Sequence, residues 1–339
     1  LHPALRPVLW KTQALPEPLE GEEIKEPEEK PITVVKFDKH RIDKNTMKAL
    51  FHLLPTSQVK TLKFSNNGIS PSQFDSIIEN LNNTPGIQTV FFDWNPLYKE
   101  DFRDLEKEED IFYQKTEDEP CRYAKLVAAE SKLKILFLRG DKITDNDAKD
   151  IIDNLKENTL LKVLDLSYNN ITITTVENLK DLICDHNKTL EFIGLAKNNL
   201  NIEQLQPLLE VIGKKPFPEE DADAHVKKMK ERDQIIEKNK KLKASKKPEE
   251  PVPLIDDIEQ LDDGSWVMVQ NGQVRHINLC MNLIGDDSKD IILDLLKRTP
   301  VEFSITLSGT QFTKEVIQEI WKELNTEENP ELGFQRLLF

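Results

Sequence analysis

Apolar residues recur along this chain with a fixed internal spacing. Segments such as LKVLDLSYNNI, which begins at Leu161, and LEFIGLAKNNL, which begins at Leu190, place apolar residues at positions 1, 4, 6 and 11 and asparagine at position 9. Alternation of apolar and polar residues around positions 4 to 6 predicts a short β-strand that is buried on one face only. The asparagine then follows the strand, where a turn is expected.

Eight segments of this kind can be aligned along the chain. They begin at Ile32, Val59, Ile87, Leu133, Leu161, Leu190, Val274 and Glu302. Successive starts are 27, 28, 46, 28, 29, 84 and 28 residues apart. A unit of about 28 residues therefore recurs, and two of the spacings carry insertions of 18 and 56 residues. Self-similarity at a fixed period of this length is the signature of a repeat architecture.

The segments between the predicted strands have the pattern of amphipathic helices. SPSQFDSIIENL, TDNDAKDIIDNL, DDSKDIILDLL and TKEVIQEIWKEL each begin with a capping Ser, Thr or Asp and then place apolar residues three and four apart. In the third unit the helix is expected to resume at PCRYAKLVAAES, with Pro120 at its start. One strand and one helix in each unit predict an α/β fold.

The template LxxLxLxxNxL resembles the leucine-rich repeat, and a strand-plus-helix unit of about 28 residues resembles the ribonuclease-inhibitor type. Parallel strands stack about 4.8 Å apart whereas helices need roughly 10 Å each. We therefore expect a leucine-rich-repeat horseshoe solenoid of about eight repeats with two insertions, its parallel strands on the concave face and its helices on the convex face. The position-9 amide is expected to satisfy backbone groups in successive turns.

These spacings divide the chain into segments. We predict an extended Pro- and acid-rich tail over 1–31, a leucine-rich-repeat domain over 32–324 with an acidic insertion over 98–118 and a second insertion over 214–269, and a C-terminal cap over 325–339. The acidic insertion has two interpretations, a surface that steers a basic partner and an ordinary solvated surface. The tail carries Leu5, Val8, Leu9 and Trp10, which form either a docking motif or a strip packed against the first repeat.

Aromatic residues gather at positions that point away from the predicted core. Positions 3, 5 and 8 of the third to sixth repeats supply Phe91, Trp94, Ile135, Phe137, Val163, Tyr168 and Phe192 on the concave face. Contiguous exposed apolar surface is unusual on a monomer, and aromatic anchors dominate interface energetics. We therefore predict a docking patch for a protein partner, the alternative being that an inserted segment of the same chain covers it.

The second insertion has a helix-prone run, EEDADAHVKKMKERDQIIEKNKKLKASKK, acidic at its start and basic at its end. Its apolar residues form only a narrow stripe, which predicts a protruding helical arm that offers a partner Lys227, Lys228, Lys230, Lys240 and Lys241. PEEPVPLIDDIEQLDD then reads as a linker, and WVMVQNGQVRHINL as a hairpin that turns at Asn271-Gly272.

Composition limits the classes of partner. The 339 residues carry a net charge of −15, which does not favour nucleic acid, and no apolar run is long enough to predict a membrane span. Three cysteines without a CxxC pattern suit a reducing cytoplasm. The histidines have no metal spacing, and phosphate-loop, zinc-protease and nucleophile-elbow motifs are absent. We expect no catalytic, cofactor or metal residues, no small-molecule substrate, and partners that are other proteins.

Two classes of function fit these features. The first is a non-enzymatic scaffold within a large assembly, since repeats broken by charged insertions resemble the leucine-rich-repeat proteins of motile cilia. That resemblance implies a place on the axoneme, at a radial spoke or the central apparatus. The second is a regulator resembling the Ran GTPase-activating family, which relies on a positioned arginine and an acidic tail. Arg139 is the comparable arginine here, whereas this sequence has no acidic C-terminal tail.

Overall fold

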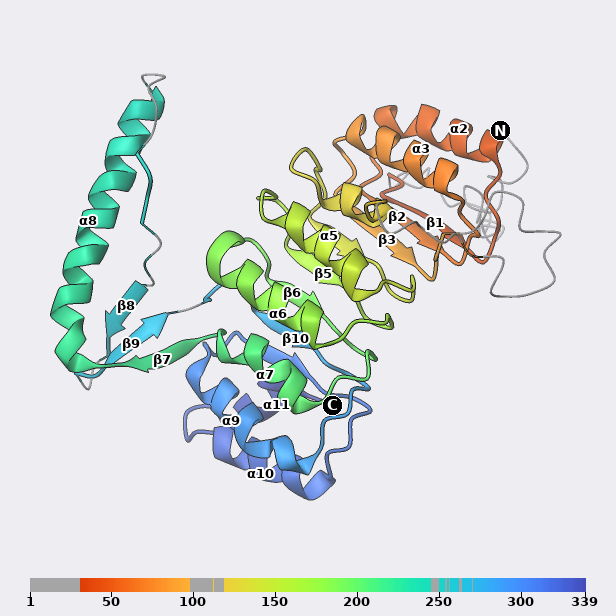
Figure 1. The fold of residues 1–339 in the computed structure, drawn as a ribbon. Coiled ribbons are helices and arrows are strands. Elements are labelled where there is room, and N and C mark those ends of the chain that lie inside the picture. Colours follow the sequence, from red (N-terminus) through yellow and green to blue (C-terminus); the bar gives the residue numbers. More distant parts are fainter. Residues whose placement is uncertain are drawn as a thin grey trace, which may run out of the picture. The chain divides into compact units, whose positions relative to one another are not determined.

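The computed structural model describes residues 31–97, 112, 119–244, 250–253, 255, 257–261, 264–269 and 271–339 (Figure 1). Most of the predicted tail and acidic insertion therefore lies outside the described residues. The chain forms two compact units, residues 1–171 and 172–339.

The first unit contains a parallel sheet whose strands follow the chain order. Its strands are β1 (Val34–Asp38), β2 (Thr61–Ser65), β3 (Thr89–Asp93), β4 (Ile135–Phe137) and β5 (Val163–Asp165). Equivalent repeat positions are Cα partners, so that Leu62 pairs with Val90 and Phe91 with Phe137. Buried residues alternate with more exposed ones along β1, β2 and β4, and along β3 as far as Phe92, as the period-2 pattern predicts. The α/β prediction is thus confirmed for this unit.

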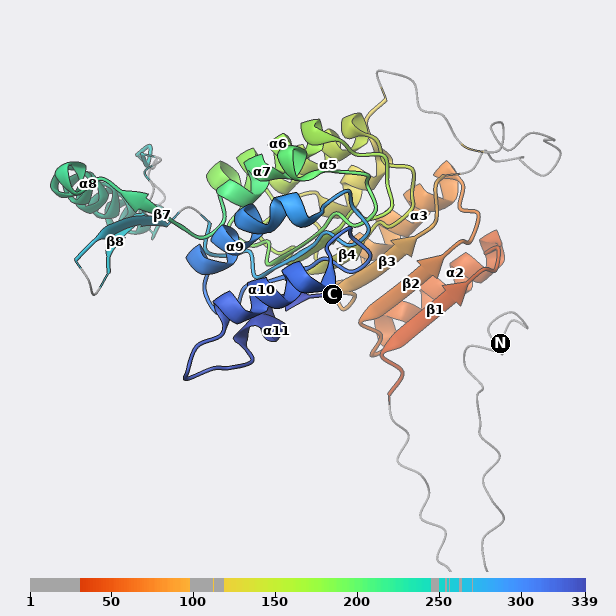
Figure 2. The ribbon, with the colours of Figure 1, turned by 90° about the horizontal axis from the view of Figure 1, so that it is seen from below.

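Helices return the chain between the strands. They are α2 (Lys44–Leu53), α3 (Pro71–Asn82) and α5 (Asp145–Leu155), with 3-10 helices at Leu54–Thr56 and Arg122–Val127. Ser70 and Thr144 form the predicted capping boxes, each accepting from the third helical N–H. The predicted helix after Pro120 is wrong in type, because the chain there forms the short 3-10 helix. Figures 1 and 2 show α2 and α3 along one face of strands β1–β3.

Aromatic side chains fill the space between this sheet and its helices. Phe64 and Phe92 are fully buried at position 6 of their strands, and Phe74 of α3 meets Phe92 edge-on with ring centroids 5.1 Å apart. Tyr123 packs on Phe74 at 5.3 Å. The helix-facing side of the sheet is therefore the core side, and the other side, called the open face below, is covered by none of the described helices of this unit.

Side chains at position 9 join successive turns through hydrogen bonds. Asn95 Oδ1 accepts from the Asn67 N–H at 2.7 Å, Asp141 Oδ1 from the Asn95 N–H at 2.7 Å, and Asn169 Oδ1 from the Asp141 N–H at 3.0 Å. Position 8 just before it takes the left-handed conformation at each of the eight strand ends, at Lys39, Asn66, Trp94, Gly140, Tyr168, Lys197, Met281 and Gly309. The predicted role of the position-9 amide is confirmed.

The second unit continues the same pattern across the long insertion. Its main strands are β6 (Phe192–Gly194), β10 (His276–Asn278), β11 (Ser304–Thr306) and β12 (Leu337–Leu338), all parallel. Its helices are α6 (Ile173–Asp181), α7 (Ile202–Glu210), α9 (Lys289–Arg298), α10 (Lys314–Leu324) and α11 (Leu332–Arg336), with a π-helical turn at Leu182–His186 and a 3-10 turn at Asp286–Ser288. Asn282 Oδ1 accepts from the Asn198 N–H at 3.1 Å, so the position-9 link bridges the insertion.

The end of the chain closes this unit. Strand β12 pairs with β11, and the buried Arg336 donates to Phe303 O at 3.0 Å and to Thr299 Oγ1 at 2.7 Å. Those hydrogen bonds satisfy groups at the last turn, so residues 332–338 cover the final repeat strand.

The long insertion is a small folded element and not a bare helix. It contains β7 (Lys214–Phe217), α8 (Glu219–Ala244), β8 (Asp257–Gln260) and β9 (Trp266–Val269), with β9 between β7 and β8 in an antiparallel sheet. The hairpin predicted at Asn271-Gly272 is wrong, because both edges of β9 are already paired. The predicted linker is also wrong in part, since it includes β8.

Candidate functional site

Two phenylalanines form the centre of the candidate site, on the open face of the first unit. Phe91 of β3 and Phe137 of β4 are Cα partners, and strand alternation turns both away from the helices. Their rings stack with centroids 4.3 Å apart and planes 3° apart. Lys63 Nζ lies 4.2 Å from the Phe91 centroid, and the Arg139 guanidinium lies 5.1 Å from that of Phe137. The result is a row of cation, ring, ring and cation across three strands.

Arg139 is held in this row by carboxylates of its own chain. Its Nε and Nη2 donate to the two oxygens of Asp93 at 3.1 and 2.6 Å, a bidentate pair, and Asp165 lies 3.9 Å away. The hydrogen bond with Asp93 raises the pKa of Arg139, whereas burial raises the pKa of Asp165. The Arg139 side chain is therefore held against the open face by these carboxylates and does not project from it.

Trp94 and Tyr168 extend the apolar surface at the carboxyl ends of β3 and β5. Both have the left-handed backbone of position 8, with φ of 56° and 62°, which is uncommon for bulky residues. Their rings lie 5.4 Å apart, and 47% of Trp94 and 37% of Tyr168 remain exposed. The indole lies over Gly140, where an added Cβ would come within 2.2 Å of it. Glycine at that position thus makes room for Trp94.

These four residues, Phe91, Trp94, Phe137 and Tyr168, are called the aromatic patch below. Of the other residues predicted to join them, Ile135 and Val163 are half-buried on the same face of β4 and β5. Phe192 belongs to the second unit, where it stacks on His276 with centroids 5.1 Å apart. The structure therefore brings six of the seven predicted residues together within one unit.

The contact of Phe192 is part of a polar group that the sequence did not single out. His276 Nδ1 lies 2.7 Å from Ser304 Oγ, and its Nε2 lies 3.0 Å from Thr306 Oγ1. Burial lowers the pKa of this imidazole, so it is neutral near pH 7. Both hydroxyls come from the strand beside His276, and this cross-strand pairing would follow from the repeat register alone.

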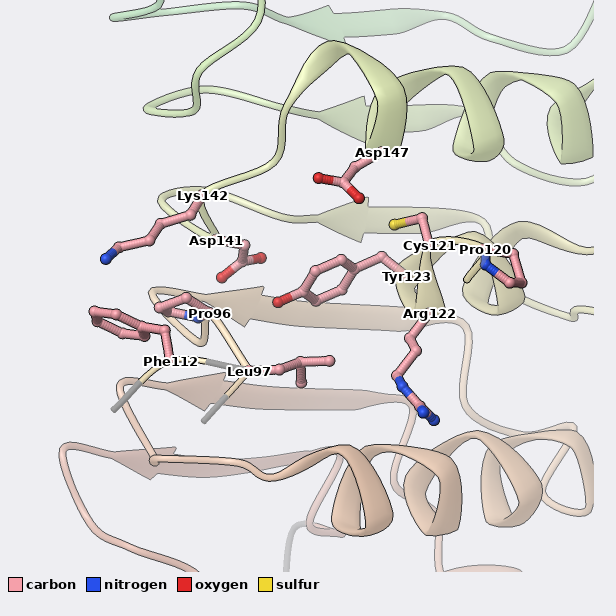
Figure 3. Close-up of a pocket in the computed structure, with 10 residues that line it drawn as sticks. All are labelled: Pro96, Leu97, Phe112, Pro120, Cys121, Arg122, Tyr123, Asp141, Lys142 and Asp147. Carbon is pink, nitrogen blue, oxygen red and sulfur yellow. The ribbon is translucent and has the colours of Figure 1, made fainter. Parts of the chain in front are cut away.

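A cavity of about 110 Å³ lies at the turn between the third and fourth repeats (Figure 3). It is lined by Pro96, Leu97, Phe112, Pro120, Cys121, Arg122, Tyr123, Asp141, Lys142 and Asp147. Burial raises the pKa of Asp141 and that of Tyr123 well above their ordinary values. The Tyr123 hydroxyl donates to Asn95 O at 2.9 Å, and Asp141 accepts from the Asn95 N–H, so both groups brace the turn.

The arm lysines lie where the sequence placed them, on α8. Lys227, Lys228, Lys230, Lys240 and Lys241 are all exposed. The opposite side of α8 packs on chain that follows it: Asn239 pairs with both backbone groups of Glu250 at 2.7 and 2.8 Å, and Arg232 donates to Asp257 at 2.7 Å. The insertion itself therefore packs on part of this side of α8, although Ile236 remains 36% exposed, and the five lysines stay exposed.

Among the described residues, no group of three or more His, Cys, Asp or Glu side chains has an arrangement that could hold a metal ion. Within the same part of the chain, no helix has the length and apolar character needed to cross a membrane.

No protein-family model matches the sequence, and no curated protein sequence does. Among solved structures, the chain is similar to the leucine-rich repeat-containing protein LegL7 from Legionella pneumophila, at 12% identity and a TM-score of 0.42. That likeness covers 81% of this chain and 64% of LegL7, so the chain spans less than two thirds of its length. Human 5T4 is similar at 11% identity and a TM-score of 0.36, over 87% of this chain and 84% of that one.

Proposed function

We propose that the protein is a non-enzymatic scaffold that docks another protein on the aromatic patch. The observation that carries this proposal is the Phe91–Phe137 stack, which lies on the open face and is extended by two exposed aromatic residues. Aromatic side chains of this kind act as anchors in protein interfaces, because they bury large areas at low entropy cost. Pairing with Asp93 fixes the neighbouring Arg139, so the surface is ordered before a partner arrives.

The exposed lysines of α8 are proposed as a second contact, for an acidic segment of the same or another partner. Residues 225–243 hold eight Lys or Arg against three Asp or Glu, in a chain whose net charge is −15. Such a local excess steers association with an acidic surface. Two contact surfaces on one chain suit a subunit that joins neighbours in an assembly.

The resemblance to leucine-rich-repeat proteins of motile cilia gives the proposal a cellular setting. We propose a structural subunit of a large cytoplasmic assembly such as the ciliary axoneme, at a radial spoke or the central apparatus. Immunolocalisation in ciliated cells tests the setting independently of the patch. Staining confined to the cell body would exclude the axoneme and leave the scaffold proposal standing.

A GTPase regulator remains the competing proposal, and the geometry of Arg139 speaks against it. A catalytic arginine must reach the phosphates of the bound nucleotide. Here both donors of the guanidinium edge are engaged by Asp93, and Asp165 lies close by. A GTP turnover assay with small GTPases separates the two proposals, because a scaffold leaves hydrolysis at its intrinsic rate.

The patch is tested by replacing both central rings, Phe91→Ser with Phe137→Ser. Crosslinking mass spectrometry in a native extract should join Lys63 of the unaltered chain to another protein, and the double variant should lose that crosslink. Truncating central anchors costs about 2 kcal/mol or more, which weakens binding about 30-fold. Val301→Ser is the matched control, since this valine is 62% exposed and lies in the other unit. Crosslinks that persist in the double variant, with its circular dichroism unchanged, would refute the patch.

The arm is tested by reversing charge at Lys227, Lys228 and Lys230 together. Crosslinks from Lys240 and Lys241 to a second protein should fall several-fold, and the loss should be mimicked in the unaltered chain by raising salt. A Gln234→Glu variant places one new negative charge on the same helix and serves as the control. If the triple variant binds as before at low salt, the lysines are ordinary solvated surface.

A further inference from the structure

The aromatic patch has a candidate occupant within the same chain. We propose that residues 5–29 lie across the open face of the first unit, with Leu5, Val8, Leu9 and Trp10 against the aromatic patch. This inference rests on the proposed function, because it concerns the same surface. It adds that a docking partner displaces the chain's own N-terminal segment, so that docking is regulated.

The open face changes in character from β1 to β4. Lys36 and Lys39 are exposed on β1 and at its end, where Lys36 pairs with Asp38 at 3.0 Å, and Lys63 on β2 leans over the first ring of the patch. The next two strands carry Phe91 and Phe137 at the equivalent position. Basic side chains therefore come first, nearest the amino-terminal strand, and aromatic side chains follow two strands further along the sheet.

The N-terminal segment has the complementary order. Residues 17–29, next to the first strand in sequence, hold seven glutamates and one lysine. Residues 1–16 hold no acidic residue and contain the four apolar side chains named above. Acidic side chains thus fall where the open face is basic, and apolar ones where it is aromatic. Each half of the segment would be mismatched if the order were reversed.

The connection to β1 permits this arrangement. Because the chain enters the sheet at Val34, the glutamates are the part of the segment closest to Lys36 and Lys63. Neighbouring strands are about 4.8 Å apart, so β4 lies only about 15 Å from β1. About twenty extended residues separate Trp10 from the strand, and they can span roughly 65 Å. The segment is therefore long enough to reach β4. Exposed ion pairs add little to affinity, so their main effect here is to set the position of the segment along the sheet.

Zero-length carbodiimide crosslinking of the purified full chain tests the placement. Glutamates 17–29 should join Lys36, Lys39 and Lys63, and should join Lys44 and Lys48 on helix α2 much less often. All five lysines belong to the first unit, which makes the helix lysines an internal control for mere proximity. Equal yields on both groups would overturn the proposal. So would crosslinks that form only between differently isotope-labelled copies, because the contact would then be intermolecular.

Hydroxyl-radical footprinting tests whether the apolar half covers the rings. Oxidation of Phe91, Trp94 and Phe137 should rise several-fold in a Leu9→Ser, Trp10→Ser variant. A Leu19→Ser variant, which removes an apolar side chain from the acidic half, should leave it unchanged. Oxidation that is equal in the unaltered chain and the double variant would overturn the proposal. Neither variant alters the repeat domain, so loss of folding does not confuse the result.

The two proposals fail in different ways. A partner protein could crosslink to the patch with the same yield in the unaltered chain and in the Leu9→Ser, Trp10→Ser variant. That result would refute the placement of the N-terminal segment and leave the scaffold proposal standing. If footprint protection depends on residues 9 and 10 but the patch crosslinks to no other protein, the N-terminal segment covers the patch and the scaffold proposal is refuted. Enhanced partner crosslinking in the double variant is the result expected if both hold.

Discussion

Asp141 occupies repeat position 9, where the repeats on either side of it have asparagine. Asparagines at position 9 donate through Nδ2 to backbone carbonyls, as Asn169 does to Leu138 O at 2.8 Å and Asn282 to Leu195 O at 2.9 Å. Asp141 keeps the accepting bond, but its Oδ2 is buried and has no hydrogen-bond partner. A proton on that oxygen would restore the donor, which agrees with the raised pKa of this carboxyl.

Replacing Asp141 by Asn should therefore stabilise the protein near neutral pH. The amide supplies the missing donor and removes a buried ionisable group, which is worth about 1–2 kcal/mol. Because burial raises the folded pKa, the stabilising contribution of the protonated Asp141 is complete below the unfolded pKa of about 3.8 and is lost as pH rises toward the folded value. Denaturant unfolding at several pH values should show the gain from Asp141→Asn growing as pH rises.

The reciprocal substitution is the control for that prediction. Asn95→Asp places a carboxyl at position 9 of the preceding repeat, where the Asn95 amide donates to Asp93 O at 3.0 Å. It should destabilise the protein, and by more at higher pH. A stability gain from Asp141→Asn that did not change with pH would mean that the carboxyl is ionised in the folded protein.

At the residue scale, the sequence predicted which side chains point to the open face and which asparagines join the turns. Strand alternation and repeat register are sufficient for both. The interaction between Arg139 and Asp93 was not predicted, because the two residues are 46 apart and only the register across β3 and β4 brings them together. The room that Gly140 leaves for Trp94 was missed for the same reason.

At the element scale, local signals failed inside the long insertion. Asn271-Gly272 is a strong short-range hairpin signal. In the structure, however, Asn271 is buried and its amide donates to Ile183 O at 2.9 Å, while its Oδ1 accepts from the Gln273 and Val274 N–H groups. A tertiary contact overrides the turn preference. The insertion has no repeat period, so the contact of α8 with the chain that follows it could not be predicted from the sequence.

Asn239 is the residue on α8 whose loss should release that following chain. Asn239→Ala removes the two hydrogen bonds to the backbone of Glu250, each worth about 1 kcal/mol. Hydrogen exchange at Glu250 and at Ile258 of β8 should become faster. The main thermal transition should stay within about 1 °C, because the pairing lies within the insertion.

Gln234→Ala, an exposed change on the same helix, is the control for helix propensity. If both variants exchanged at the same rate, the pairing of α8 with the following chain would not stabilise the insertion. A large fall in the main transition in Asn239→Ala alone would show instead that the insertion and the repeats unfold together.

At the scale of the whole chain, the repeat period predicted a strand at each of eight places, and a strand is present at each. The period works because every unit must bury the same face against its neighbours. Phe192 shares repeat position 3 with Ile135 and Val163, although it belongs to the second unit. Sequence position within a repeat specifies a face, and it does not specify which faces form one surface.

The long insertion should be removable without unfolding the second unit, because the chain closes beneath it. The Gly213 N–H donates to Asn271 O at 3.2 Å, and the Asn271 N–H donates to Val211 O at 3.1 Å. Arg298 of α9 also donates to Ile212 O, so the base is tied to the repeats. We expect a chain in which a short Gly/Ser loop replaces 214–269 to fold, with a thermal midpoint within a few degrees of the original. It should retain the patch crosslinks of Lys63 and lack those of the arm. An unfolded product would show that the sheet of β7, β8 and β9 supports the repeats. In the shortened chain, Asn271→Ser should lower the midpoint, because it removes the side-chain hydrogen bonds of Asn271 to Ile183 O and to the Gln273 and Val274 N–H groups.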